Sequence, residues 1–526
     1  MSEKEPAGYD AIVIGSGFGG AVTACRLSEA GYKVLVLERG RRWSPETFPR
    51  GKGDPFVWNH DHPEKHNGWL DLRLFPNMGV AQGAAVGGGS LIYANVSIDA
   101  KPDTFEQGWP QEITFEELVP RYAKVKEMLG SRHVPDNQWS RRTQLMKEAA
   151  EKIGAGDRFE LLDLAVSFDE GWNWDLENRH SPAHSKTFTN PHGKKQGTCV
   201  HLGNCDLGCD VNARNTLDLN YLAVAEAKGA EVRPLHLVRG IEPKDGGYRV
   251  WYDEIRSGAL IGGEAQARIV IVAAGSLGST ELLLRCRDQF GTLPALSPFL
   301  GHNWSSNGDF LTPAIHPLRK IKPTRGLTIT SAINFLDGAR GERFYIEDGG
   351  FPDVVGNYLK EQAKEEGEGD AARALLQTIR FFLSGPGDPT QAVMPWFAQG
   401  RDAANGTFKL EHGRFCLDWN VKQSEPVINA IVKTHKELAA KTQGIPLVPF
   451  TWELFKDLVT PHPLGGCNMG REPADGVVDH KGEVFGYRNL YVADAAIIPE
   501  AIGLNPSKTI AALAERIAEI LVAEGR

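Results

Sequence analysis

Hydrophobic residues near the start of the chain form two short uninterrupted runs with a helical pattern between them. The first run lies within residues 10–14 and the second within 33–38. Continuous apolar runs are typical of parallel strands, which are buried on both faces. Between them, the apolar residues of 20–30 recur at helical spacing, and Gly31 ends the pattern. Residues 9–40 are therefore predicted to form a strand–helix–strand unit.

The same order of strand and helix returns twice, and a different pattern occupies the middle of the chain. Residues 267–286 contain a buried run, a turn at Gly275 and a helix. Residues 482–521 contain a strand-like run and then a long amphipathic helix. Residues 327–335 and 413–421 instead alternate between apolar and polar positions, which predicts an antiparallel sheet.

Length, charge and cysteine content narrow the class of protein. A chain of 526 residues is too long for one simple core and indicates two or three domains. The net charge of −9 is unlike the basic surface of a nucleic-acid-binding protein. An odd number of Cys, with no apolar leader at the N-terminus, favours a reducing compartment. We expect a cytoplasmic protein with no nucleic-acid partner and no stable membrane insertion, whose oligomeric state stays open.

The loop after the first predicted strand carries a glycine motif that suits a dinucleotide. Its six residues are Gly15, Ser16, Gly17, Phe18, Gly19 and Gly20, which match G-x-G-x-x-G. Gly15 makes the turn, Gly17 allows the backbone to approach a pyrophosphate, and Gly20 allows the helix to pack on the strand. The N-terminus of the helix then faces the anion.

Glu38 ends the second predicted strand, where its carboxylate can bind a ribose 2′-hydroxyl. The same carboxylate would repel a 2′-phosphate, so NADP is disfavoured. The strand, the helix and the acidic residue together indicate dinucleotide binding, and a glycine-rich turn without a ligand is the alternative. This unit alone does not choose between NAD and FAD.

A second glycine-rich segment precedes a strand-like run. Gly83, Gly87, Gly88 and Gly89 stand before residues 90–98, which read SLIYANVSI. So many glycines imply backbone lying against a flat or anionic group. A loose loop is the alternative, and the apolar run that follows argues against it.

Residues 460–470, TPHPLGGCNMG, combine a His, a Cys and a Met and so raise the question of a metal site. Cys467 has no second Cys or His at ligand spacing nearby, and His462, five residues upstream, is a poor partner for tetrahedral zinc. We interpret Cys467 and Met469 as packing residues and predict no metal site.

Together these motifs resemble the glucose–methanol–choline (GMC) family of FAD oxidoreductases, and most closely its cholesterol-oxidase-like branch. The resemblance covers nearly the whole chain and rests on segments in the family's order: 9–40, VGGGS (86–90), AAGSLGSTELLL (273–284), LGHNWSSNGD (300–309), HPLGG (462–466) and NLYVAD…GLNPSKTIAALAER (489–516). It implies FAD as the cofactor. It also implies that Glu38 holds the adenosine ribose, that the Val238 backbone meets the adenine, and that Asp494 lies near the ribityl and pyrophosphate groups.

The resemblance further implies that His462 and Asn505 face the substrate beside the flavin N5. Alcohol oxidation removes a proton from oxygen and a hydride from carbon; a neutral His can accept the proton, and Asn505 can orient the hydroxyl. Asn505 is expected to cap the C-terminal helix, with Pro506 at its first position. The helix N-terminus would stabilise negative charge on the flavin. Gly465 and Gly466 are expected to lie beside the ring. A purely capping Asn505 and a purely structural His462 are the alternatives.

Two places depart from the family pattern. Steroid oxidases carry an Asn near the flavin three residues after the Ser that matches Ser90, but this chain has Tyr93 there, and Asn95 is the nearest Asn. We keep Ser90 and Asn95 as candidate cofactor contacts. Glu347 is a candidate second base, because steroid-oxidising relatives use a Glu from this domain; a solvated strand end is the alternative. Because the chain departs from the pattern of steroid oxidases, we do not predict cholesterol as the substrate.

Two clusters of possible metal ligands stand outside these motifs. The first comprises Cys199, Cys205, Cys209 and His201, and the second comprises His60, His62 and His66. We favour a local disulfide or free thiols for the first cluster and an exposed loop for the second. A metal site is the alternative in both, and no residue is assigned to a covalent attachment of FAD.

The expected fold is α/β, α+β overall, with two domains. A discontinuous Rossmann-like FAD-binding domain takes residues 1–130, 195–310 and 455–526, and a substrate domain with an antiparallel sheet takes 131–194 and 311–454. Aromatic residues are frequent in the second domain and suit an apolar pocket or a core. They are Phe335, Phe344, Tyr345, Phe381, Phe382, Trp396 and Phe397.

These observations predict an FAD-dependent oxidase or dehydrogenase that acts on the CH–OH group of a bulky, apolar or cyclic, sterol-like alcohol. The electron acceptor would be O2 or another redox partner. Three alternatives stay open: a redox-neutral lyase of the same family, a dehydrogenase of sugar-like alcohols with an acceptor other than O2, and a flavin-binding protein without catalysis.

Overall fold

The strand–helix–strand unit at the N-terminus is present in the computed structural model, which describes residues 8–51, 53–353 and 389–525. Strand β1 (Tyr9–Ile14) leads into helix α1 (Phe18–Glu29) and strand β2 (Val34–Leu37). β1 pairs in parallel with β2 on one side and with β12 (Ala259–Val272) on the other. Because it is central, its apolar run is buried on both faces, as an uninterrupted run requires.

A seven-stranded sheet grows around this unit. Its order is β10-β11-β12-β1-β2-β9, and β21 pairs with β12 as well. The added strands are β9 (Glu231–Arg233), β10 (His236–Lys244), β11 (Gly247–Arg256) and β21 (Leu490–Val492). β21 is parallel to β12, so the carboxyl end of a strand from the C-terminal region meets the carboxyl ends of β1 and β12.

A second, six-stranded sheet is antiparallel and has the order β19-β13-β16-β15-β14-β6. Its strands are β6 (Phe159–Leu161), β13 (Phe310–Ile315), β14 (Ser331–Phe335), β15 (Phe344–Asp348), β16 (Val393–Gly400) and β19 (Ile445–Pro446). The α/β fold class is therefore confirmed. The domain boundaries stay a prediction, and β13 begins at Phe310, one residue before the predicted start of the substrate domain at 311.

One predicted strand of this sheet lies elsewhere. β18 (Arg414–Asp418), from the alternating stretch 413–421, pairs with β17 (Thr407–Glu411) in a separate hairpin. Alternation predicts a strand with one buried face, but it does not determine which strand is its neighbour. A further short pair is formed by β7 (Phe188–Thr189) and β8 (Lys195–Gln196).

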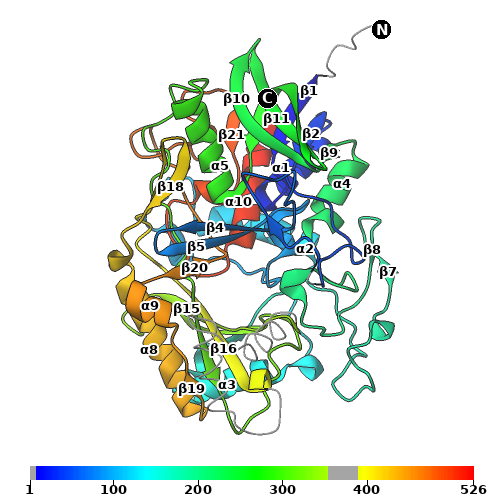
Figure 1. Ribbon diagram of the computed structural model, residues 1–526, viewed down its shortest axis with the longest axis vertical. Helices are drawn as coiled ribbons and strands as arrows, with labels where there is room; N and C mark the ends of the chain where they lie inside the picture. Colours follow the sequence, from blue (N-terminus) through cyan, green and yellow to red (C-terminus); the bar gives the residue numbers. More distant parts are fainter. Residues whose placement is uncertain (1–7, 52, 354–388, 526) are drawn as a thin grey trace.

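A small sheet lies between the two large ones, as Figure 1 shows. It has the order β20-β5-β4-β3, formed by β3 (Val57–Trp58), β4 (Leu70–Phe75), β5 (Met78–Gly83) and β20 (Leu458–Thr460). β20 ends two residues before His462, so this sheet positions the start of the HPLGG segment.

The helices cover the two large sheets from different sides. α4 (Tyr221–Ala227) and α10 (Ser507–Ala523) pack against α1, and α2 (Phe115–Leu129) packs against α10. α3 (Arg141–Lys152) and α8 (Glu425–Lys441) pack on the six-stranded sheet at the opposite end of the molecule (Figure 1). The remaining α-helices of the described residues are α5 (Gly275–Leu284), after β12, and α9 (Phe450–Phe455). No helix in these described ranges is long and apolar enough to cross a bilayer.

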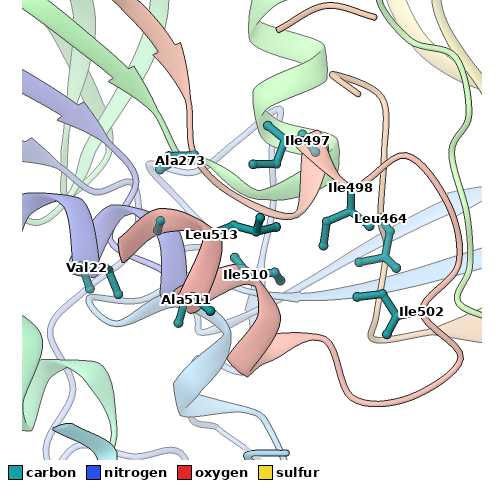
Figure 2. Close-up of a cluster of buried hydrophobic side chains, with 14 of the residues drawn as sticks. Val22, Ala273, Leu464, Ile497, Ile498, Ile502, Ile510, Ala511 and Leu513 are labelled. Carbon is teal, nitrogen blue, oxygen red and sulfur yellow. The ribbon is translucent and has the colours of Figure 1, made fainter. Parts of the chain in front are cut away.

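Distant segments meet in a hydrophobic cluster around α10, drawn in Figure 2. Val22 comes from α1, Ala273 follows β12, Leu464 belongs to the HPLGG segment, and Ile510 and Leu513 come from α10. All are at most 8% exposed. Burial of apolar side chains from such separate segments holds the carboxyl ends of the parallel strands, HPLGG and the α10 N-terminus together.

Residues 90–98 do not form the predicted strand. Residues Gly88–Leu91 form a 3-10 helix, and the rest is irregular apart from one bridge between Val96 and Leu164. The reason is a buried guanidinium: Arg214 donates hydrogen bonds to the carbonyls of Ser90, Leu91 and Tyr93. A side chain thus takes the place of the neighbouring strand that the apolar run would otherwise require.

Candidate active site

A cavity of about 570 Å³ lies between the seven-stranded and six-stranded sheets. Most of the residues predicted to bind the cofactor or substrate line it. These are Gly15, Gly17, Phe18, Gly19, Glu38, Gly83, Gly88, Gly89, Val238, Gly275, His462, Asp494, Asn505 and Pro506. Fold and local motifs thus bring six separate parts of the chain to one site.

The glycine loop has open space beside Gly17, whereas Gly15 and Gly20 pack closely against other protein atoms. A Cβ on Gly17 would meet no described protein atom within 4 Å, so this backbone faces the cavity. In contrast, a Cβ on Gly15 would lie 2.3 Å from the Ala273 carbonyl oxygen, and one on Gly20 would lie 2.1 Å from that of Gly15. Gly20 therefore serves helix packing, and Gly17 leaves room for a ligand at the N-terminus of α1.

Glu38 lies at the cavity wall with its carboxylate held by the glycine loop. Ser16 donates to Oε2 from its N–H at 3.0 Å and its hydroxyl at 2.6 Å, and the Gly40 N–H donates to Oε1 at 2.8 Å. Burial raises the pKa of Glu38, while these hydrogen bonds oppose the increase. The carboxylate is thus fixed in place and keeps lone pairs for a ribose hydroxyl.

Asp494 connects the end of β21 to the start of α5. It accepts hydrogen bonds from the Gly275 and Ala496 N–H groups, both at 2.8 Å, and from the Ser279 hydroxyl. Burial raises its pKa to about 6. A second set of backbone donors, at the N-terminus of α5, is therefore ordered at the cavity next to the glycine loop.

Four of the predicted cofactor contacts do not line the cavity. Gly20, as described above, packs α1 on the sheet, and Gly87 precedes the 3-10 helix with a φ of 98°. The Ser90 hydroxyl donates to the Gly87 carbonyl and accepts from the Leu217 N–H. Asn95 accepts a hydrogen bond of 2.6 Å from Arg214 Nε. These residues shape the loop and do not themselves face the ligand space, whereas Tyr93 does.

His462 is held in one orientation by a residue that the sequence analysis did not assign. Its Nδ1 lies 2.9 Å and 3.0 Å from the two carboxylate oxygens of Asp309. Asp309 is fully buried and also accepts from the Thr460 hydroxyl, which in turn accepts from the His462 N–H. Nε2 is then the ring nitrogen left for a ligand in the cavity.

Asp309 also changes the acidity of the histidine. Burial lowers the pKa of His462, but attraction to Asp309, their hydrogen bond and the nearby Glu347 outweigh burial and raise it. Asp309 closes the LGHNWSSNGD segment, so its position at the end of a quoted motif was the available signal. Its partner lies 153 residues away, and no local pattern predicts that pairing.

Asn505 is not a helix cap. The residue at the N-cap of α10 is Pro506, the helix begins at Ser507, and no side chain caps it. The Oδ1 atom of Asn505 is buried and has no hydrogen-bond partner within the described ranges. The prediction of Asn505 as cap and Pro506 as first helical residue was wrong by one position, because Pro506 itself precedes the first helical turn. The residue itself lines the cavity.

Glu347 is buried, so the alternative of a solvated strand end was wrong. It lies on β15 with no exposed surface, opposite Phe397 of β16, and accepts a hydrogen bond of 3.0 Å from Gln399 Nε2. Burial raises its pKa to about 7, while Gln399, His462 and Asn505 oppose the increase. Glu347 therefore sits behind the cavity surface within electrostatic reach of both predicted catalytic residues.

Gly465 and Gly466 do not lie against the cavity. A Cβ on Gly465 would lie 2.2 Å from the Asn303 carbonyl oxygen, and one on Gly466 would lie 2.2 Å from the Thr280 hydroxyl oxygen. Both residues have positive φ, of 80° and 103°. Their role is to let HPLGG pass close to neighbouring protein segments. Cys467, next along, is buried in the core, as the packing interpretation predicted.

The two clusters of possible metal ligands lie in different settings. Cys199, Cys205 and Cys209 are free thiols, and burial raises the pKa of the first two. Of the second cluster, His60 lines the cavity, with Nε2 3.4 Å from Glu281. Across the part of the chain that the structure describes, no group of three or more His, Cys, Asp or Glu is arranged to hold a metal ion.

The six-stranded sheet contributes the apolar part of the wall. Leu311, Ile329, Phe351, Pro395 and Phe397 line the cavity. The Phe397 ring centroid lies 6.2 Å from that of His462. The other predicted aromatic residues within the described ranges, namely Phe335, Phe344, Tyr345 and Trp396, are core residues, and Phe381 and Phe382 lie outside those ranges.

Comparison with known proteins identifies relatives along the whole chain. Residues 401–514 match the family described as GMC oxidoreductase, and residues 13–63 match an NAD(P)-binding Rossmann-like domain. The chain is 32% identical to a cholesterol oxidase of Acinetobacter baumannii, with 97% of this chain and 93% of the relative covered. It is 33% identical to a cholesterol oxidase of Mycobacterium tuberculosis, covering 97% and 91%. It is 26% identical to a 2-methyl-1,2-propanediol dehydrogenase of Mycolicibacterium austroafricanum, covering 97% and 95%.

Solved structures share the fold at lower identity. A pyridoxine 4-oxidase from Mesorbium loti superposes with a TM-score of 0.63 at 17% identity, over 97% of this chain and 98% of that one. A fungal aryl-alcohol oxidase gives a TM-score of 0.62 at 17% identity, over 99% and 100%. At this identity the likeness shows the arrangement of the elements and not the chemistry.

Proposed function

Because the chain belongs to the GMC family of FAD-dependent oxidoreductases acting on alcohols, we propose that its substrate is a bulky, apolar or cyclic alcohol of the sterol type. The cholesterol oxidases among its relatives support a sterol-like substrate. The apolar wall formed by Leu311, Ile329, Phe351 and Phe397 supports a bulky and weakly polar one.

The cofactor is FAD, and the residues at the cavity fit it. The open backbone at Gly17 and the N-terminus of α1 suit the pyrophosphate, and Glu38 suits the adenosine ribose. Val238 also lines the cavity, which supports a contact with the adenine, and the Gly275–Asp494 junction there supports a contact with the remainder of the linker. When bound, FAD supplies the acceptor for the hydride that leaves the alcohol carbon.

In this proposal His462 takes the hydroxyl proton at Nε2. The observation that carries it is the His462–Asp309 pair: Nδ1 is tied to a buried carboxylate at 2.9 Å, and the other side of the ring is left for the cavity. Asp309 holds the ring in one orientation and stabilises the imidazolium that forms. Asn505 lines the cavity, and an N–H of its side-chain amide provides a donor for the substrate oxygen.

The N-terminus of α10 adds fixed positive potential. Pro506, Ser507 and Ile510 line the cavity, so the first turn of a 17-residue helix is directed at it. The unpaired N–H groups of that turn favour negative charge nearby without rearranging. These contacts support a role for the start of α10 in stabilising negative charge that builds up at the cavity during the reaction.

The electron acceptor is proposed to be O2 or another redox partner. Relatives named as oxidases and a relative named as a dehydrogenase both align along this chain. The test is to mix the purified yellow protein anaerobically with sterols, terpenoid alcohols, sugars and alkanols, record the loss of flavin absorbance, and then admit air. We expect bleaching by bulky cyclic alcohols and slower or no bleaching by sugars.

The same experiment separates the alternatives. If sugars bleach the flavin and sterols do not, the substrate class is wrong. If no alcohol bleaches it, the protein is a redox-neutral relative or a flavin-binding protein without catalysis. Rapid recovery of absorbance in air indicates an oxidase, whereas recovery only with an added dye indicates a dehydrogenase.

A further inference from the structure

A carboxyl group that the proposed chemistry does not use also faces the cavity. Asp206 lies in the short 3-10 helix Cys205–Leu207 and lines the cavity beside Thr328 and Ile329. Its Oδ1 accepts a hydrogen bond of 3.2 Å from the Thr328 hydroxyl. This is its sole hydrogen bond to the described residues, although a carboxyl group offers about four positions.

Two arginines lie near Asp206 without pairing with it. Arg142 donates to the carbonyls of Thr328, Asp348 and Gly349, and Arg214 donates to the carbonyls of the 90–93 loop and to Asn95. Burial raises the pKa of Asp206 to about 6, and Arg214, Thr328 and Arg142 only partly oppose it. A carboxyl group that is removed from bulk water and keeps unused acceptor positions lowers the stability of the folded protein, unless a ligand donates hydrogen bonds to it.

A second polar group on the same wall is unpaired. Tyr93 lines the cavity, and its buried hydroxyl has no partner among residues 8–51, 53–353 and 389–525. The Arg214 guanidinium lies over the Tyr93 ring, and the ring centroids of Tyr93 and Phe18 are 5.5 Å apart. Cys205 is close enough to Tyr93 to influence the pKa of its hydroxyl. Because Cys205 is also the chain neighbour of Asp206, Asp206 and Tyr93 belong to one side of the cavity.

We propose that Asp206, with Tyr93 beside it, binds a second hydroxyl group of the substrate, other than the one that is oxidised. This inference rests on the proposed alcohol oxidation and narrows its substrate class to alcohols that carry a further hydroxyl. A hydroxyl group fits better than an ammonium group, because the guanidinium groups of Arg142 and Arg214 already place positive charge nearby. The surrounding wall of Ile329 and Phe351 is also apolar and would leave a cation poorly solvated.

The test compares matched pairs of alcohols in the intact FAD-loaded protein. Each pair consists of a 3β-hydroxysteroid or a terpenoid alcohol and the same molecule with one additional hydroxyl group; a third member carries an amine in place of that hydroxyl. For at least one pair we expect kcat/KM to be about tenfold or more higher for the dihydroxy compound. The monohydroxy compound leaves the Asp206 carboxyl group without that hydrogen bond, which lowers its kcat/KM. The difference should lie mainly in KM.

Two variants and a control assign this preference to the carboxyl group. Asp206→Leu should reduce the ratio of dihydroxy to monohydroxy kcat/KM to about one, while the rate with the monohydroxy compound stays within about threefold. Asp206→Asn, which keeps an acceptor, should retain part of the ratio, and Tyr93→Phe should lower it by less than Asp206→Leu. The control is Asp210→Asn, since Asp210 binds Arg50 and Asn204 and does not line this cavity.

The outcomes distinguish this inference from the proposed function. If alcohols bleach the flavin but no pair shows a preference, or if Asp206→Leu leaves the preference unchanged, the second-hydroxyl site is wrong and alcohol oxidation stands. If the amine is preferred to the hydroxyl, the ligand class is wrong. If no alcohol bleaches the flavin, the proposed function fails first. Visible absorbance that is unchanged in Asp206→Leu shows that the variant still binds FAD and is folded.

Discussion

The two walls of the cavity present different kinds of atoms to a ligand. The wall of the seven-stranded sheet presents mainly backbone, at Gly17, at Gly89 and at the start of α5, together with the fixed carboxylate of Glu38. The wall toward the six-stranded sheet presents side chains, with His462 and Asn505 supported by buried acids. The turn at Gly17 and the Glu38 carboxylate depend on residues close in sequence, whereas His462 depends on a partner 153 residues away.

This difference separates binding from reaction. Adding a side chain at a glycine of the backbone wall should weaken cofactor binding. This effect should not depend on the residues of the other wall. Removing a functional group from the side-chain wall should slow the reaction and leave the cofactor in place. Substitutions on each wall therefore test whether binding and reaction are separate.

The largest effect is expected for His462→Ala. Loss of the group that accepts the proton should slow anaerobic flavin reduction by about 10²–10⁴-fold, while the protein remains yellow. The measurement is the rate of bleaching by a reactive alcohol in a stopped-flow instrument. His302→Ala, at an exposed histidine, is the control and should react like the wild type. A colourless His462→Ala protein would show that this side chain belongs to cofactor binding.

Gly17→Val tests the opposite wall. The space at Gly17 is open to the cavity and its φ of −72° suits any residue, so the chain should fold and FAD affinity should fall by about 10–100-fold through steric overlap. FAD titration of the apoprotein measures this. Gly262→Val is a matched control, because a Cβ there also meets no described atom within 4 Å and lies away from the cavity. Unchanged FAD affinity would mean that the cofactor does not approach this backbone.

Glu347→Gln tests the buried acid behind the reactive side chains. Because burial raises the pKa of Glu347 from 4.5 to about 7, the folded protein holds this proton more tightly than the unfolded chain. Wild-type stability should therefore fall as pH rises from 5 to 8, by about 2 kcal/mol relative to Glu347→Gln, which has no proton to lose. Denaturant unfolding of both proteins across this range measures the difference. Parallel stability curves would place Glu347 in a solvated setting.

Asp309→Asn tests how the histidine is prepared. His462 must be neutral to accept a proton, so the reaction slows as pH falls below its pKa. Asp309 raises that pKa, and the neutral amide should let it drop, which moves the acidic limb of the kcat/KM profile to lower pH. An acidic limb that does not move would mean that another group controls it.

The parts of this structure that could be predicted are those whose interacting residues are close together in the sequence. The residues from Gly15 to Glu38 are neighbours in sequence, so the turn, the helix start and the acid are specified within one unit. The role of Arg214 was missed because its acceptors lie more than a hundred residues away, and for the same reason the run 90–98 was assigned to a strand. Gly465 and Gly466 were correctly identified as positions of close approach, but the approaching group proved to be protein.

By itself, the sequence determined the order of the strand–helix units, the glycine turn, and the presence of a histidine and an asparagine that resemble those of a known family. The tertiary structure decided which acid each of them meets: Asp309 for His462, and Glu347 near Asn505. Hydrogen bonds within a turn depend on the next few residues and leave a local pattern. The contacts of buried acids depend on which segments the packed core brings together, and that is a property of the whole chain.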